Sequence, residues 1–266
     1  MTRAGKTALI LSLLLALAAC AATPKDPDDR KQVDETNDPA EPANRTIFAV
    51  NKALDDNVMR PVAVAYRDNV PEGVQHGVHN FLSNLSEPVI GLNDALQGNM
   101  GRAQTAWLRF VMNTVFGGVG LFDVATPSKL PHHDSDFGQT LGVWGIPQGP
   151  FVELPVFGPS DVRDAVGTGI SFVVDPFFLA GGAPLTYASI GVGGGNAIDQ
   201  RAANIDTLDA IESTSVDYYA TLRSLYRQRR EALVEEGKNP DQHHGGRVDV
   251  ILPPDEVPDI QPGNTP

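Results

Sequence analysis

Residues 196–236 read NAIDQRAANIDTLDAIESTSVDYYATLRSLYRQRREALVEE, and apolar residues recur in this stretch about every 3.5 positions. That period matches one face of an α-helix, so the stretch predicts a long amphipathic helix. Its apolar face would consist of Ile198, Ala202, Ile205, Leu208, Ile211, Val216, Tyr219, Leu222 and Tyr226. Several arginines gather near its end, where positive charge complements the helix dipole. The longest element of the chain is therefore expected to be helical.

Two further stretches have the same helical spacing. Apolar residues within 71–85 and within 99–116 each fall on one side of a helix. The segment FVELPVF at residues 151–157 is the one stretch that alternates as a strand does, and Pro155 limits it to a sheet edge or a hairpin. We therefore predict an all-α domain of amphipathic helices with at most a minor β-hairpin.

The connectors between these helices combine glycine with bulky apolar residues. Residues 116–130 read FGGVGLFDVATPSKL, and residues 173–195 read VVDPFFLAGGAPLTYASIGVGGG. Both are expected to be loops. Loops of soluble proteins are usually polar, so these segments either pack inside the domain or line an apolar passage or a membrane interface.

The amino terminus has the pattern of a secretory signal. Arg3 and Lys6 precede an uncharged apolar run, which is shorter than the roughly 20 residues that a membrane-spanning helix needs. The run ends in LAAC at residues 17–20, which resembles the bacterial lipobox, and Cys20 is the single cysteine of the chain. We expect Cys20 to be lipidated. Because Ala21 follows it in place of aspartate, the expected destination is the outer membrane, with the protein on its periplasmic face.

Composition divides the chain into four parts. Residues 1–19 form the signal peptide, residues 20–37 the lipidated cysteine and a flexible tether, residues 38–237 the folded domain, and residues 238–266 a proline-rich, disordered tail. Removal of the signal peptide leaves 18 basic and 33 acidic residues, a net charge of 18 − 33 = −15. Such a charge repels phosphate backbones, so nucleic acid is not an expected partner.

Motifs of enzyme chemistry are scarce. The glycine runs lack the spacing of nucleotide-binding loops, and the usual patterns of zinc proteases and serine hydrolases are missing from the sequence. The best cluster is His132, His133, Asp134 and Asp136, whose side chains are of the types that bind zinc or act as acid and base. The competing interpretation is a polar loop in which Asp134 caps the next helix. We expect no metal site and no catalytic residue.

Five blocks of the sequence, together with VDPF at residues 174–177, resemble the VacJ/MlaA family of outer-membrane lipoproteins. In order along the chain they are NDPAEPANRTIFAVN (37–51), RPVAVAYRDNVP (60–71), NFLSNLSEP (80–88), FVMNTVFGGVGLFDVA (110–125) and FGQTLGVWGIPQGPFVELPVFGPSDVRD (137–164). They span most of residues 37–232.

The resemblance implies a ring-shaped helical domain in the inner leaflet of the outer membrane, with an amphipathic central channel. It implies that the protein removes phospholipid that has strayed into the outer leaflet and passes it to a soluble periplasmic carrier, in association with a trimeric porin. On this interpretation the protein is not an enzyme, and it needs no cofactor.

Two sets of residues inside the matched blocks are candidates for this function. The glycine-rich apolar segment would form a channel or gate, through Gly117, Gly118, Val119, Gly120, Leu121 and Phe122. Four arginines would contact the lipid headgroup, namely Arg45, Arg60, Arg109 and Arg163. Each arginine has a competing interpretation, a salt bridge to a nearby acid such as Asp68 or Asp164.

Two other classes of function stay open. A phospholipid hydrolase would depend on the cluster at His132 and His133. A structural lipoprotein would hold a protein partner against the outer membrane and would bind no lipid.

Overall fold

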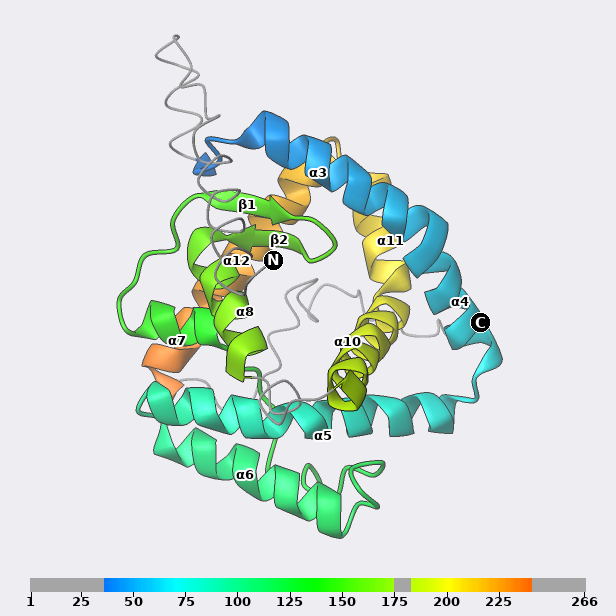
Figure 1. The fold of residues 1–266 in the computed structure, drawn as a ribbon, viewed down its shortest axis with the longest axis vertical. Coiled ribbons are helices and arrows are strands. Elements are labelled where there is room, and N and C mark those ends of the chain that lie inside the picture. Colours follow the sequence, from blue (N-terminus) through cyan, green and yellow to red (C-terminus); the bar gives the residue numbers. More distant parts are fainter. Residues whose placement is uncertain (1–35, 175–182, 241–266) are drawn as a thin grey trace, which may run out of the picture.

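The computed structural model describes residues 36–174 and 183–240. Over these residues the chain is mainly helical, with one two-stranded antiparallel sheet, so the predicted all-α class with a minor hairpin is confirmed. Figure 1 shows the helices arranged as a ring around a central region. The signal peptide, Cys20, nearly all of the tether, the apolar residues 175–182 and most of the tail lie outside the described residues.

One side of the ring is a continuous helical arc. It consists of α3 (Glu41–Leu54), the π-helical turn η1 (Asp55–Met59) and α4 (Arg60–Asn69). Pro42 stands in the first turn of α3, where its missing N–H costs nothing. Pro61 cannot donate a backbone hydrogen bond to the turn before it, and the widened turn η1 lies directly before α4, whose first turn contains Pro61.

The base of the ring is α5 (Glu72–Leu96), against which α6 (Met100–Val115) packs on the outer side (Figure 1). Both helices contain the stretches predicted from apolar spacing. The two run antiparallel and approach closely at Gly91, where a Cβ atom would stand 2.8 Å from Trp107 Nε1. The glycine therefore permits the contact between the two helices.

The opposite side of the ring holds the shorter elements, α7 (Phe137–Val143), β1 (Phe151–Leu154), β2 (Gly158–Asp161) and α8 (Val162–Val174). The strands pair Phe151 with Asp161 and Leu154 with Gly158. Strand β1 covers the first part of the segment that alternates in the sequence, and Pro155 follows its last residue, as expected for a hairpin.

The prediction of a single unbroken helix over residues 196–236 is wrong. The chain instead forms α10 (Ala183–Ala203), α11 (Ile205–Thr214) and α12 (Tyr218–Lys238). The second break ends at Asp217, whose carboxylate accepts a hydrogen bond of 3.1 Å from the backbone N–H of Ala220 and so caps α12. Apolar periodicity continues across both breaks, which is why it concealed them.

The glycine-rich connector expected at residues 173–195 is also partly wrong, because residues 183–195 belong to α10. Four glycines inside a helix each cost about 1 kcal/mol relative to alanine. Packing compensates for that cost, since α10 lies against α4 and α5. Ala63, Ala202 and Ile205 form a small apolar cluster where α4 meets the α10–α11 junction.

Candidate functional site

Polar side chains occupy much of the interior. Among the described residues, buried polar and charged residues outnumber buried apolar ones, and many of the buried apolar residues are alanines. The buried charged and amide residues include Asp38, Asn44, Asn84, Glu87, Asn93, Asp94, Arg109, Asn113, Gln139, Glu153, Asp161, Arg163, Asp164, Asp199, Arg223 and Arg230. The fold is therefore held together to a large extent by buried ion pairs and hydrogen bonds.

Arg109 is the centre of one such cluster. Its side chain is 3% exposed and its Nε lies 2.5 Å from Glu87 Oε1, while the side chain of Glu87 is 0% exposed. Its other nitrogens donate to the carbonyl oxygen of Leu130, to Thr126 Oγ1 and to Asp123. The guanidinium thus ties α5 and α6 to the loop that follows α6.

Arg163 lies in a second buried cluster, where β2 and α8 meet α12. Its Nε donates to Asp164 Oδ1 at 2.9 Å, and Asp164 also accepts from Tyr226 and forms an ion pair with Arg230. Burial, together with repulsion from Asp164, raises the pKa of Asp161 to about 6. A cavity of ≈ 180 Å³ adjoins this cluster, lined by Asp136, Pro159, Ser160, Asp164, Gly167, Thr168, Ser171, Tyr226 and Arg230.

The other two predicted headgroup residues are more exposed. Arg45 pairs with Glu41 and with Asp217, and its side chain is 40% exposed. Arg60 pairs with Asp209 through two hydrogen bonds of 3.2 and 2.6 Å. Arg60 also lines an open cavity of ≈ 410 Å³, together with Lys52, Asp56, Asp209, Glu212 and Ser213.

All four arginines therefore have acidic partners, and the structure does not bring them to one site. Of the two acids considered in the sequence, Asp164 pairs with Arg163, whereas Asp68 pairs with Arg67. Headgroup contact stays a prediction for the four arginines. Arg60 fits it best, because its side chain reaches an open cavity.

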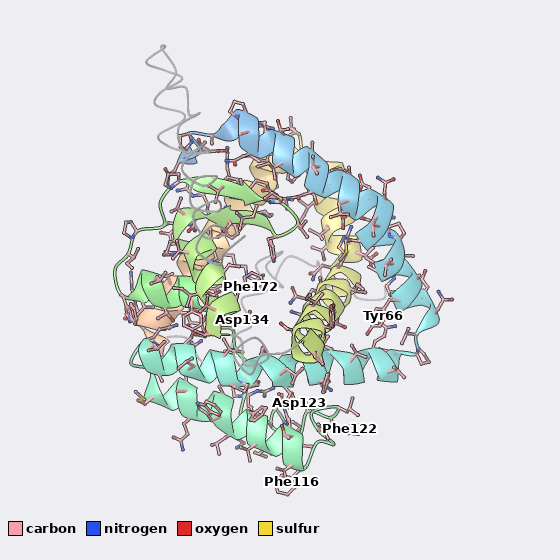
Figure 2. All side chains as sticks on the ribbon, viewed as in Figure 1. Tyr66, Phe116, Phe122, Asp123, Asp134 and Phe172 are labelled. Atoms are coloured by element: carbon pink, nitrogen blue, oxygen red, sulfur yellow. The ribbon has the colours of Figure 1, made fainter. Side chains whose placement is uncertain are left out.

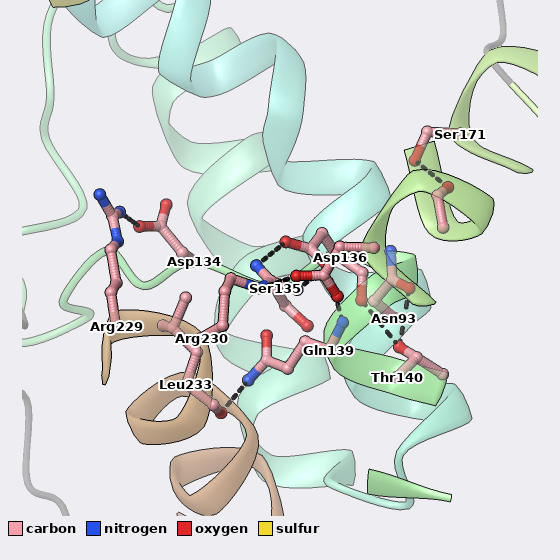
Figure 3. A network of polar contacts seen from close by, with 12 residues as sticks. Asn93, Asp134, Ser135, Asp136, Gln139, Thr140, Ser171, Arg229, Arg230 and Leu233 are labelled. Carbon is pink, nitrogen blue, oxygen red and sulfur yellow. Dashed lines mark hydrogen bonds and ion pairs between the residues drawn. The ribbon is translucent and has the colours of Figure 1, made fainter. Parts of the chain in front are cut away.

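The members of the histidine and aspartate cluster have different main partners, and within the cluster His132 Nε2 lies 3.7 Å from Asp134 Oδ1. His132 Nδ1 lies 3.0 Å from Glu87 and His133 Nε2 lies 2.6 Å from Asp94, so both histidines attach the loop to α5. Figure 3 shows Asp134 beside Arg229, whereas Asp136 contacts Arg230. No group of three possible metal ligands is found within residues 36–174 and 183–240.

The cap expected at Asp134 is wrong by two residues. Asp136 is the N-cap of α7, because its Oδ1 accepts a hydrogen bond of 2.7 Å from the backbone N–H of Gln139. Both aspartates precede the helix, and either could have capped it. Asp134 is drawn instead toward Arg229, which belongs to α12 and is not visible to local sequence reasoning.

The predicted channel segment, Gly117 to Phe122, is a compact loop at the end of α6. Its backbone closes on itself, since Phe122 N–H donates to Gly117 O at 2.8 Å and Gly120 N–H donates to Asn113 O at 2.8 Å. Val119 has a φ of 62°, which is uncommon for a β-branched residue. Figure 2 places Phe116 and Phe122 beyond α5, on the outside of the ring. A gating role for this segment stays a prediction.

Large apolar side chains are exposed over much of the surface. On α6 they form one face of the helix, which consists of Met100, Trp107, Leu108, Val111 and Val115. Val119, Leu121 and Phe122 extend this face onto the following loop. Across 36–174 and 183–240, no helix combines the length and the apolarity required to cross a bilayer. Exposed apolar faces of this size mark contact with a membrane or with another apolar surface.

Two features of the structure were not identified from the sequence. Sequence reasoning did not identify Glu87 or Asp94, which are buried acids on a helix whose apolar spacing directed attention elsewhere. It also did not single out Phe157 and Phe172, which contact each other between the hairpin and α8. The sequence signal that could have identified this pair was Phe157, an aromatic residue at the turn of the predicted hairpin.

Comparison with known proteins agrees with this architecture. A family model described as MlaA lipoprotein matches residues 36–233. A protein of Haemophilus influenzae named intermembrane phospholipid transport system lipoprotein MlaA is 34% identical over 240 residues, which is 88% of this chain and 93% of that protein. The Escherichia coli protein of the same name is 34% identical over 242 residues, 90% of this chain and 92% of its own length.

A solved structure described as the structural basis for maintenance of bacterial outer membrane lipid asymmetry has the same fold. It aligns with a TM-score of 0.66 and 35% identity, and the alignment covers 74% of this chain and 98% of the solved one. The resemblance drawn from the sequence blocks is thereby confirmed. This chain belongs to the MlaA lipoprotein family.

Proposed function

We propose that this protein is an outer-membrane lipoprotein that removes mislocalised phospholipid from the outer leaflet and passes it to a periplasmic carrier, so that lipid asymmetry is maintained. The observation that carries the proposal is where the apolar and the charged side chains lie in this member of the MlaA lipoprotein family. Large apolar residues face outward on α6 and on the loop that follows it, while charged residues are buried and paired.

This distribution suits a protein that rests among lipids. An amphipathic helix buries its apolar face in the boundary between headgroups and acyl chains, and the gain scales with the buried apolar area. The apolar face of α6 supplies such an area. Lipid that moves between a bilayer and water needs both apolar and polar surroundings, and the ring has both kinds of surface.

Lipidation of Cys20 would hold the protein at the outer membrane. Two or three acyl chains, at about 0.8 kcal/mol for each buried methylene, make an anchor that rarely dissociates. Residues 20–37 would then be the tether between the anchor and the domain. A trimeric porin and a soluble periplasmic carrier are the proposed protein partners, and the relatives are named as parts of a phospholipid transport system.

We propose transport without catalysis. The relatives are named as transport lipoproteins, and His132 and His133 are each engaged by a buried carboxylate of α5. In that position the two histidines support the loop that follows α6, a structural role.

The proposal is tested by the amount of phospholipid in the outer leaflet, labelled from outside with an impermeant amine reagent. Cells without the gene should have more surface phospholipid, and a wild-type copy should restore the low level. A Cys20→Ser copy, expressed equally, should fail to restore it. An unchanged level on deletion would reject lipid retrieval and would favour a structural role.

A further inference from the structure

The turn of the β1–β2 hairpin has an unusual backbone. Pro155, Val156 and Phe157 connect the strands, and Val156 has a φ of 71°. A β-branched side chain rarely adopts positive φ, because its branches crowd the backbone. Val156 is also 73% exposed, so burial of its own side chain does not compensate for the strain. Neighbouring groups must hold the turn in this shape.

Asn51 of α3 holds the turn. Its Oδ1 accepts a hydrogen bond of 2.8 Å from the backbone N–H of Val156, and its Nδ2 donates to the carbonyl oxygen of Leu154 at 2.9 Å. The same Nδ2 lies 2.9 Å from Glu153 Oε1. A single amide side chain thus fixes the backbone on both sides of Pro155. The next side chain, Phe157, is placed by this arrangement.

Phe157 extends over α8 and contacts Phe172. The two ring centroids are 5.7 Å apart with an interplanar angle of 78°, an edge-to-face arrangement. Both rings are more than half exposed, at 64% and 53%. Figure 2 places Phe172 on the side of α8 that faces the middle of the ring. The aromatic pair therefore presents apolar surface toward the interior of the ring.

The apolar surface continues along α8. Val162, Val166 and Val173 are exposed, and a Cβ atom at Gly169 would meet nothing within 4 Å. These positions recur at helical spacing and carry no charge. The opposite face of α8, which includes Gly167 and Ser171, borders the polar cavity. Together with Phe157 and Phe172, the exposed positions of α8 make an apolar strip, which we name the hairpin strip.

We propose that the hairpin strip binds an acyl chain of the phospholipid as it passes through the ring. The inference rests on the proposed function and adds the place where the chain is held. The occupant is argued from the lining, which consists of exposed, uncharged valine and phenylalanine side chains. A flexible hydrocarbon chain fits such a strip, because it needs no hydrogen bonds and gains about 0.8 kcal/mol for each methylene buried.

The test compares substitutions at the strip with a matched substitution at an exposed apolar residue that belongs to neither proposed lipid-contacting surface. Phe157→Asp and Phe172→Asp put a carboxylate where the acyl chain would lie, and Phe157→Leu keeps the site apolar. Val216→Asp is the control, because Val216 is fully exposed between α11 and α12 and belongs neither to the strip nor to the apolar face of α6. All three positions are exposed, so thermal unfolding of the four purified variants should match the wild type.

Retrieval of phospholipid is measured in cells that carry each variant in place of the wild-type chain. We expect retrieval about tenfold slower, or worse, for the two strip aspartates, and near-normal retrieval for Phe157→Leu and Val216→Asp. Normal retrieval with both strip aspartates would overturn the inference. Equal loss with Val216→Asp would also overturn it, since the strip would then be no different from any other exposed apolar position.

A direct contact is measured with purified, lipidated full-length protein in liposomes that contain phospholipid with a photoreactive acyl chain. Labelled peptides that include Phe157 or Phe172 support the inference, and their absence while α6 is labelled overturns it. If the wild-type chain itself fails to lower surface phospholipid in cells, the proposed function fails. That outcome is distinct from a failure of the strip alone.

Discussion

Glu87 of α5 and Arg109 of α6 form an ion pair of 2.5 Å in which neither side chain is more than 3% exposed. Removing one partner of a buried pair leaves an uncompensated charge, which typically costs about 3–5 kcal/mol. Arg109→Met should therefore lower the free energy of unfolding by that amount in urea denaturation. Arg67→Ala is the control, since Arg67 pairs at the surface and should cost less than about 1 kcal/mol.

The double variant Glu87→Gln/Arg109→Met separates the charge from the packing. If the cost of Arg109→Met comes from the buried carboxylate of Glu87, which then keeps only His132 as a cationic partner, neutralising Glu87 should recover part of it. Strict additivity of the two single losses would contradict this explanation.

His132 should make the stability depend on pH. Burial lowers the pKa of His132, but attraction to the carboxylates of Asp134 and Glu87 outweighs this effect and raises the pKa to about 9. Because the folded pKa lies above the usual value, the stabilisation is complete below about pH 6.5 and is lost as the pH rises through about 9. Its size should be on the order of 1–2 kcal/mol, after allowance for the partial exposure of the ring.

The check on His132 is a series of urea denaturations between pH 6 and pH 10. Wild type should lose more stability over this range than His132→Gln, which cannot be protonated. Parallel curves for the two proteins would show that His132 is not charged in the folded state.

Two glycines of α8 should respond in opposite directions to alanine. A Cβ atom at Gly167 would stand 2.7 Å from Gly138 Cα, so Gly167→Ala should force α7 and α8 apart and cost about 1–3 kcal/mol. Gly169 has open space beside it, so Gly169→Ala should stabilise the helix by up to about 1 kcal/mol. Thermal unfolding of both variants measures the difference, and equal shifts would refute the close contact.

Asn51 should be important for the hairpin turn. Asn51→Ala removes the partners of Val156 N–H and Leu154 O, and we expect a loss of about 1–3 kcal/mol. Asn57→Ala in the same helical arc is the control, because Asn57 donates to one exposed carbonyl, that of Ala53. Hydrogen exchange at Val156 should accelerate in Asn51→Ala alone, and unchanged exchange would contradict the assigned role.

The elements that could be predicted from the sequence are those whose signal lies within one short stretch of the chain. Apolar spacing identified the helices at residues 71–85 and 99–116, and Pro155 marked the end of β1. It did not locate the breaks before α11 and α12, because the apolar period runs through them. It also took the glycines at 193–195 for a loop, since only packing against α4 and α5 makes that segment helical.

The buried polar contacts were harder to predict from the sequence. Arg109 was singled out, but its partner Glu87 lies 22 positions away on another helix. Asp134 and Asp136 are two residues apart, and Arg229 and Arg230 of α12 determine which of them caps α7. Such choices depend on contacts between distant segments, which periodicity and spacing do not encode.

Lipid retrieval is tested most directly by following labelled phospholipid that is inserted into the outer leaflet of living cells. Its loss from the surface is timed in cells with the wild-type gene, without the gene, and with the gene restored. We expect rapid loss with the wild-type gene, slow loss without it, and recovery on restoration. Equal rates in all three, with the protein present at its normal level, would contradict a function in lipid retrieval.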